Sequence, residues 1–564
     1  MWVLVGALAL TLRLASLAAA PLNAQEAHEA NLAWRAATGQ GVQGAGYSPL
    51  LLAANALVFA LCGASDTLAR FWPAILGGAL ALAPAWLRKH IGRAGALAAG
   101  VYLALSPTVL VASRQLDGAV VAAVGVLAAL GGLLRFFETD RRRWLMLVAG
   151  GVALAVTGSP LAYGLLVTGG LAWLLLAWVW PDEGMHQALE RLRPHLGYLL
   201  AAFLFSGAGL ATGLGWNPGG LGAAGDLLAA WAARFSPAQN PGASPLALLA
   251  VYEPVALLCG LGGLAWAIRR GHRLGIFLGL WAGLGGLLLA LMPGRAVLDV
   301  LGVLLPLALL AGVALAALVQ NLQEQEGWLS EGLYALVVAF LWVHLVLMLA
   351  HYANFGSPAD LALALLTVAL QILLALMFAL ALRVEVALRA VTLGTIAMLL
   401  VSTLAAAWGS AYVRPADPRE LLAHEPAAVE VRDLVQTLRG LSWRRTNVPT
   451  ALSFTYEAAP DSLLAWYLRD FSAARRVENL DLEEEMAPVV VTERRELAVD
   501  LPEGVDYAGQ DFALGRRWDV REAGCTWGWP PQCVAAVRWL FYRNTVTPPV
   551  VDQWAVVWVR RGEE

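Results

Sequence analysis

The sequence predicts an all-α domain that crosses a membrane many times, followed by a small soluble α/β domain. Of its 564 residues, 59% are hydrophobic and the mean hydropathy is +0.64, whereas soluble globular proteins contain about 45–50% apolar residues. Apolar runs of roughly 20 residues, long enough to cross a bilayer, recur from Met1 to about Tyr412. The composition then becomes charged and mixed. We therefore expect a transmembrane domain over 1–411 and a soluble domain over 412–564.

The distribution of Lys and Arg predicts the orientation, because these residues concentrate in cytoplasmic loops. The base-rich loops are 88–93, 138–143, 191–195, 269–273 and 383–389, and the base-poor loops between them are 113–118, 157–160, 216–245, 293–295 and 351–358. Met1–Ala20 then runs outward from a cytoplasmic N-terminus. The further expected spans are 70–87, 94–112, 119–137, 144–157, 160–180, 196–214, 246–268, 274–292, 296–319, 333–350, 360–382 and 390–411. This makes about thirteen spans, an odd number that places the C-terminal domain outside the cytoplasm.

The same parity predicts two helices that lie in the membrane interface within the first external loop. Only an odd number of crossings fits between that loop and the cytoplasmic loop 88–93, yet two apolar runs lie between them. Pro49–Cys62 is short for a span, so we expect it to be interfacial or re-entrant. A second amphipathic helix is expected over about Gln25–Ala37, with Trp34 as an aromatic anchor.

The expected soluble domain contains helices over about 426–441 and 462–471 and strands over 449–455, 488–492 and 554–559. The segment WYLRD is predicted to be ordinary aromatic core or a lid over the membrane site. Cys525 and Cys533 flank a Pro-rich loop and predict a disulfide if this domain faces an oxidising compartment. No His or Cys neighbours suggest a zinc site, and the net charge of −3 gives no reason to expect nucleic acid as a partner.

Charged residues on the outer membrane face are the candidates for chemistry. Glu26, His28 and Glu29 follow the first span, and Asp117 follows the third span. A carboxylate there can act as general base toward an acceptor hydroxyl, and a second carboxylate can orient it or hold a divalent cation. The structural alternatives are a solvated interfacial face for Glu26 and Glu29, an interfacial position for His28, and a helix cap for Asp117.

Cations on the same face are candidates for binding a leaving phosphate. They are Arg295, Arg114 and Arg70, and a snorkelling or topology charge is the alternative for Arg295. Glu253 and Asp299 lie near the ends of later spans and are further candidates that we expect to face one cavity. They also leave a transporter open as a third functional class.

Four segments resemble the GT-C membrane glycosyltransferases of the dolichyl-phosphate-mannose protein mannosyltransferase and aminoarabinose transferase group. They are QEAHEANLAW, GYSPLLLAANALVFALCGASDTLARFWPAILGG, RKHIGRAGALAAGVYLALSP and SRQLDGAVVAA. The flippase-activity-associated subgroup is similar also in the tail, at SLLAWYLRDF and RWLFYR. The resemblance implies a GT-C fold with interfacial helices in the first external loop, a polyprenyl-phosphate sugar as donor and an external acceptor.

Residue by residue, the resemblance matches Glu26 to the second acid of the family's Asp-Glu pair, Asp117 to the acid after the third span, and Arg295 to a later basic residue. Gln25 stands where the family has its presumed base, and the family's Lys near 157–160 is missing. Two hypotheses follow. The chain is an inverting glycosyltransferase in which Glu26, Asp117 or Glu29 serves as base, or it is a non-catalytic GT-C-like subunit of a membrane complex that handles lipid-linked sugar among other membrane subunits and lipids.

Overall fold

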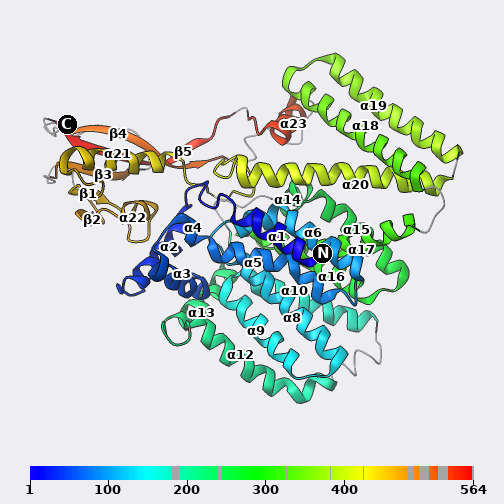
Figure 1. The fold of residues 1–564 in the computed structure, drawn as a ribbon, viewed down its shortest axis with the longest axis horizontal. Helices are drawn as coiled ribbons and strands as arrows, with labels where there is room; N and C mark the ends of the chain where they lie inside the picture. The colour runs from blue at the N-terminus through cyan, green and yellow to red at the C-terminus, as the bar shows by residue number, and fades with distance from the viewer. Residues whose placement is uncertain are drawn as a thin grey trace.

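The computed structural model describes the chain except for residues 43, 181–189, 238–243, 324–327, 382, 424, 481–486, 495–506, 519–530, 546 and 562–564. It has a large helical body with a β-sheet at one end of its long axis (Figure 1). Helix α20 (Val384–Trp408) runs along one side of the body and leads from the α18–α19 pair toward the sheet. The predicted combination of a helical membrane domain and a small C-terminal sheet is confirmed.

The helices of the first half alternate with short loops, as expected for a polytopic chain. They are α1 (Trp2–Leu14), α2 (Ala24–Ala37), α3 (Pro49–Cys62), α4 (Asp66–Ala69), α5 (Phe71–Leu82), η1 (Ala83–Leu87), α6 (Arg93–Leu105), α7 (Pro107–Ser113), α8 (Ala119–Thr139), α9 (Arg143–Gly158) and α10 (Leu161–Val179). Both expected helices of the first loop are present as α2 and α3, and they pack against each other. Their position in a membrane interface stays a prediction.

The second half of the helical body continues in the same way. Its elements are η2 (Arg193–His195), α12 (Leu196–Ala211), α13 (Gly220–Ala233), α14 (Pro245–Tyr252), α15 (Pro254–Arg270), α16 (Arg273–Ala290), η3 (Val297–Val300), α17 (Leu301–Gln323), α18 (Trp328–Phe355), α19 (Pro358–Ala381), α20 and the π-helix η4 (Gly409–Val413).

Eight of the described helices are long and apolar enough to cross a membrane, and the number rises to ten if two bent helix pairs each count as one span. The pair α6–α7 bends by 58° and the pair α14–α15 by 102°. Each second helix begins with proline, Pro107 or Pro254, which lacks the N–H that would continue the preceding helix. Four shorter apolar helices remain. The chain is an integral membrane protein, and the count of thirteen spans stays a prediction.

The C-terminal sheet has the strand order β2-β1-β3-β5-β4. Its strands are β1 (Phe454–Glu457), β2 (Ala474–Val477), β3 (Val489–Arg494), β4 (Tyr507–Arg517) and β5 (Val550–Arg560), and the accompanying helices are α21 (Glu430–Thr446), α22 (Leu463–Leu468) and α23 (Pro531–Tyr542). Strand β1 pairs in parallel with β2 and β3, whereas β5 pairs antiparallel with β3 and β4. We did not predict β2, β4 or α23.

The first strand begins later than the predicted range 449–455. The Ser442 hydroxyl accepts hydrogen bonds from the backbone amides of Ala451 and Leu452 at 3.1 and 3.0 Å. These two amides therefore donate to a side chain of α21 and not to a neighbouring strand. The strand starts only at Phe454.

The C-terminal part docks directly on the first external loop. Asp66, at the start of α4, accepts hydrogen bonds from the Trp466 indole and the Tyr467 hydroxyl of α22, both at 2.9 Å. One hydrophobic cluster joins side chains of α2 and α3 to those of α21, α22 and the sheet. Helix α23 instead packs on α18, where the Arg538 guanidinium donates to the carbonyl of Ala353.

Candidate functional site

Glu26 is buried and fully hydrogen-bonded at the start of α2. Its side chain is 2% exposed, and its two oxygens receive two N–H groups of Arg70, both at 2.7 Å. The backbone amide of Leu116 donates to Oε1 at 2.7 Å, and the amide of Asn23 donates to Oε2 at 3.0 Å, which forms a capping box with Asn23. Each oxygen therefore accepts two donors. This carboxylate holds the loop together and has no lone pair left for a substrate proton.

Arg70 forms hydrogen bonds to the turn that follows the first helix. Besides Glu26, its guanidinium donates to the carbonyls of Leu17, Ala20 and Pro21 at 2.9–3.0 Å. These carbonyls lie beyond the end of α1, where helix-type partners are missing. Arg70 thus fixes the path from α1 into α2 and places Glu26 next to Leu116.

Arg114 is a second buried cation at the same turn, and its side chain comes from the end of α7. It donates to four carbonyls, those of Leu12, Arg13, Ala15 and Ser16, and its guanidinium lies 4.5 Å from the centre of the Tyr412 ring. It is 7% exposed. Within the described part of the chain it forms no ion pair with a carboxylate.

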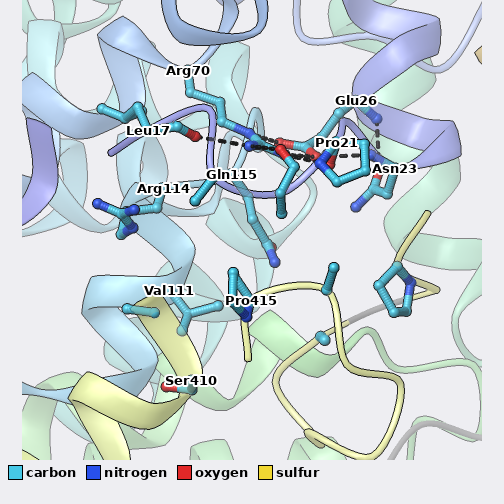
Figure 2. Close-up of a pocket in the computed structure, with 16 residues that line it drawn as sticks. Leu17, Pro21, Asn23, Glu26, Arg70, Val111, Arg114, Gln115, Ser410 and Pro415 are labelled. Atoms are coloured by element: carbon cyan, nitrogen blue, oxygen red, sulfur yellow. Dashed lines mark hydrogen bonds and ion pairs between the residues drawn. The ribbon is translucent and has the colours of Figure 1, made fainter. Parts of the chain in front are cut away.

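A small cavity of about 50 Å³ lies between this turn and the segment that leaves α20. Arg70, Arg114 and Gln115 line it on one side, and Ser410 and Pro415 line it on the other. Figure 2 shows Pro21, Asn23 and Glu26 across the cavity from Ser410 and Pro415. The space holds a few water molecules and is too small for a sugar phosphate.

Glu29 and Asp117 form an acid pair on the buried side of α2, one helical turn beyond Glu26. Glu29 is 6% exposed, and its Oε2 is buried without a hydrogen-bond partner among the described residues. Burial raises the pKa of Glu29 well above its usual range, and the Asp117 and Glu26 carboxylates raise it further, against a hydrogen bond from the Ser48 backbone. A buried carboxyl with a raised pKa beside a second carboxyl is a common arrangement in acid–base catalysis.

Asp117 also stabilises the start of α8, as the structural alternative predicted. Its Oδ1 accepts the backbone amide of Ala119 at 2.6 Å. The side chain is half-buried, so it is less enclosed than Glu29. This capping contact holds the carboxylate in place beside Glu29 and is compatible with a second role.

His28 and Arg295 lie away from the cavity. His28 contacts the carbonyl of Ala45 at 3.1 Å and the Asp461 carboxylate at 3.6 Å, so it lies at the junction with the C-terminal part. Arg295 lies in the loop before η3 and donates to the carbonyl of Met292 at 3.3 Å. Neither residue lines the cavity next to Arg114.

Glu253 and Asp299 do not face one cavity, which corrects the expectation from sequence. Glu253 is fully enclosed between two helix breaks and accepts from the Tyr102 and Ser106 hydroxyls and the Thr108 amide. Asp299 instead pairs with Arg234. The cause is that each carboxylate is compensated by a different part of the chain, Glu253 by donors of α6 and α7 and Asp299 by Arg234 at the end of α13.

Several buried polar residues at this junction were missed by reasoning from sequence. Arg13 is completely buried in α1 and donates to the Ser113 hydroxyl and to carbonyls of α1 and α6. Glu420 pairs with Arg414 and Arg543 and accepts the Tyr252 hydroxyl at 2.7 Å. Arg13 stands out as a basic residue inside an apolar run, which is a signal that sequence carries. Glu420 has no such signal.

Two predicted features are not decided by the structure. Cys525 and the side chain of Cys533 lie outside the described part of the chain, so their disulfide stays a prediction. For a divalent cation, the described residues contain no group of three or more His, Cys, Asp or Glu side chains that would hold a metal ion. The acid pair alone supplies two carboxylates.

Comparison with known proteins bears on the fold. No family model and no curated protein matches the chain. The crystal structure of ArnT from Cupriavidus metallidurans bound to undecaprenyl phosphate superposes with a TM-score of 0.54 at 16% identity, over 87% of this chain and 92% of that one. The apo structure of the same protein gives the same TM-score and coverage at 18% identity. The chain therefore has the fold of ArnT.

Proposed function

We propose that the chain is a membrane glycosyltransferase that moves a sugar from a polyprenyl phosphate to an acceptor outside the cytoplasm. The observation that carries this proposal is the placement of two buried guanidiniums, Arg70 and Arg114, on one cavity close to the Glu29–Asp117 acid pair. The shared fold supports it, because the ArnT structure holds undecaprenyl phosphate.

Arg114 is the phosphate contact in this proposal. Arg70 is already neutralised by Glu26, whereas Arg114 is a buried cation surrounded by carbonyls without a carboxylate partner in the described chain. A buried cation is costly unless an anion compensates it. The phosphate of the lipid donor would supply that anion and would be stabilised as negative charge develops on the leaving oxygen.

Asp117 is the general base in this proposal. The acceptor hydroxyl attacks the anomeric carbon from the side opposite the phosphate, and its proton moves to the Asp117 carboxylate as the carbon–oxygen bond to phosphate breaks. The products are the inverted glycoside and the polyprenyl phosphate. Burial and the neighbouring Asp117 carboxylate raise the pKa of Glu29, so Glu29 binds a proton more readily than an exposed glutamate and adds less negative charge beside Asp117 than an exposed glutamate would.

The segment between α20 and α21 has to move for a donor to enter. A cavity of about 50 Å³ does not admit a sugar phosphate, because small-molecule pockets usually measure about 300–1,000 Å³. One wall is formed by Ser410, Ala411, Pro415, Ala416, Ala423 and Pro426, so displacement of these residues opens the space. In this proposal the N-terminus lies in the cytoplasm and the acid pair faces the outer side.

One observation favours the second candidate function, a non-catalytic helper that binds lipid-linked sugar. Gln25 occupies the position of the family's presumed base, and its side chain is exposed, whereas the adjacent Glu26 is buried in the pair with Arg70. A chain without a working base would bind the donor and leave it intact. Such a helper would act within a complex with other membrane subunits.

The experiment that tests the proposal separates donor binding from turnover. The full-length protein in lipid nanodiscs is incubated with undecaprenyl phosphate and with a panel of radiolabelled undecaprenyl-phosphate sugars, and bound lipid and released sugar are both measured. We expect both lipid binding and sugar release. We also expect Arg114→Gln to weaken binding of undecaprenyl phosphate about tenfold or more, because the substitution removes one charge-assisted contact. Arg141→Gln, at an exposed cytoplasmic-loop position, is the matched control. Binding without release supports the helper function, and no binding across the panel contradicts both.

A further inference from the structure

A second, larger cavity lies where α2 meets the C-terminal part, on the side of α2 that carries Trp34 and Arg35. Its volume is about 510 Å³, against about 50 Å³ for the cavity next to Arg114. Helix α2 forms one wall, and β1, α22 and β2 form the other. The volume falls within the range of small-molecule sites, about 300–1,000 Å³.

The walls of this cavity carry more positive than negative charge. Arg35, Arg469 and Arg476 line it, and Glu478 is the one acid among the lining residues of the described chain. Arg35 is paired with Asp461 at 2.8 Å. Arg476 donates to the carbonyl of Ala458 at 3.1 Å and forms no ion pair in the described chain, which leaves most of its five donors for a ligand.

Arg469 adds a partly desolvated cation to the same wall. Its guanidinium lies 3.8 Å from the centre of the Trp466 ring and donates to the carbonyl of Ala64 at 2.9 Å. Burial lowers the pKa of Arg469, although the neighbouring Asp470 and Asp66 raise it. The Asp470 carboxylate lies 3.6 Å from the Arg469 guanidinium, so Arg469 adds a paired cation to this wall, and Arg476 is the cation that favours a ligand bringing negative charge.

Aromatic side chains lie beside these cations. Tyr456 and Arg476 are direct partners in the parallel pairing of β1 and β2, so both side chains lie on one face of the sheet, and Trp34 lines the opposite wall. The electron-rich face of an aromatic ring packs well against polarised C–H groups, which a pyranose ring supplies. Guanidiniums pair with carboxylate or phosphate.

The cavity lies on the face of α2 opposite to Glu29. Trp34 and Arg35 lie five and six residues beyond Glu29 on this helix, and a rotation of about 100° per residue places them about 120–140° around the helix axis from it. The cavity is therefore a site separate from the acid pair.

We propose that this cavity binds an acidic saccharide, with carboxylate or phosphate groups on Arg476 and Arg469 and a sugar ring against Trp34. The binding of this saccharide does not rest on the proposed function. The arginines favour an acidic saccharide over a neutral one. The aromatic side chains favour a saccharide over an acidic peptide.

The test measures binding to the full chain in nanodiscs by calorimetry. The probes are trigalacturonate, neutral galactotriose, and acetylated, amidated triglutamate, which has the same three carboxylates without sugar rings. We expect trigalacturonate to bind about tenfold or more tightly than either other probe, and Arg476→Gln to reduce that affinity about tenfold, since one charge-assisted contact contributes about 1.5 kcal/mol or more. Arg475→Gln is the matched control, because Arg475 is the exposed neighbour on the other face of β2 and does not line the cavity. This variant should bind as the wild type does.

Three results would overturn the proposal: equal binding of the acidic and neutral saccharides, equal binding of triglutamate, or equal losses in the two arginine variants. Absence of trigalacturonate binding overturns it as well. Undecaprenyl phosphate binding is measured in the same samples. If the lipid binds and trigalacturonate does not, this inference fails while the proposed function stands. If trigalacturonate binds and the lipid does not, the proposed function fails while the saccharide site stands.

Discussion

Glu26 and Arg70 form a two-armed ion pair in which both nitrogen–oxygen distances are 2.7 Å and both side chains are buried. The pair joins the start of α2 to the turn that follows α1, and it places Leu116 against the same carboxylate. Glu26 therefore has a positioning role in the candidate site. The other acids in its neighbourhood are Glu29 and Asp117.

We expect Glu26→Gln to destabilise the protein strongly. The substitution leaves the buried Arg70 charge uncompensated, and breaking a buried pair in this way costs about 3–5 kcal/mol. Thermal unfolding of the detergent-solubilised protein, followed by size-exclusion chromatography, measures the effect. The control is Glu430→Gln, which removes the surface pair with Arg516 and should cost about 1 kcal/mol or less. Equal shifts in the two variants would contradict the positioning role.

Stability should fall as the pH rises because of Glu29. Its pKa in the folded protein is raised, so its contribution is fully present below the unfolded pKa and is lost as the pH increases toward the folded pKa, by at most about 1.4 kcal/mol per pH unit. Glu29→Gln should flatten this part of the profile and should stabilise the protein at alkaline pH. Melting temperatures between pH 5 and 9 test this, with the exposed Glu478→Gln as a control that keeps the wild-type slope. An unchanged slope in Glu29→Gln would refute the assignment.

Asp117→Asn should abolish sugar release while donor binding persists. Loss of a general base reduces the rate by about 10²–10⁴-fold, and the amide still accepts the Ala119 amide hydrogen, so α8 keeps its cap. Release of labelled sugar and retention of undecaprenyl phosphate are measured together, and Asp226→Asn, at an exposed position of α13, is the control. If Asp117→Asn releases sugar at the wild-type rate, Asp117 is not the base.

Docking of the C-terminal part should depend on Asp66. Asp66→Asn weakens the contacts to Trp466 and Tyr467, and a hydrogen bond to a charged group contributes about 1.5–3 kcal/mol. We expect amide exchange in α22 to accelerate about tenfold or more. Hydrogen–deuterium exchange with mass spectrometry measures this. Asp470→Asn, which removes an exposed carboxylate of the same segment, should leave the exchange of α22 within a factor of two or three.

Trp466 of the WYLRD segment belongs to the aromatic core, which was one of the two predicted alternatives, and the lid over the membrane site stays a prediction. Trp466 is buried in the hydrophobic cluster, as ordinary core would be, and its indole nitrogen donates to Asp66 of the first loop. The periodicity of aromatic residues predicts burial but not the partner. The partner lies about 400 residues away in the chain, and only the fold brings it close.

Local patterns in the sequence were sufficient for the membrane class, the first-loop helices and the small sheet domain. The lengths of the apolar runs and the distribution of basic residues over the loops are local features, so they can be read directly from the chain. The roles of Glu26, Glu29 and Asp117 depend on which of these carboxylates forms the ion pair with Arg70. That ion pair forms across 44 residues, and the cavity between α2 and β2 joins segments more than 400 residues apart. Charge compensation and burial are properties of the packed tertiary structure, and they decided that Glu26 is the carboxylate that anchors the loop.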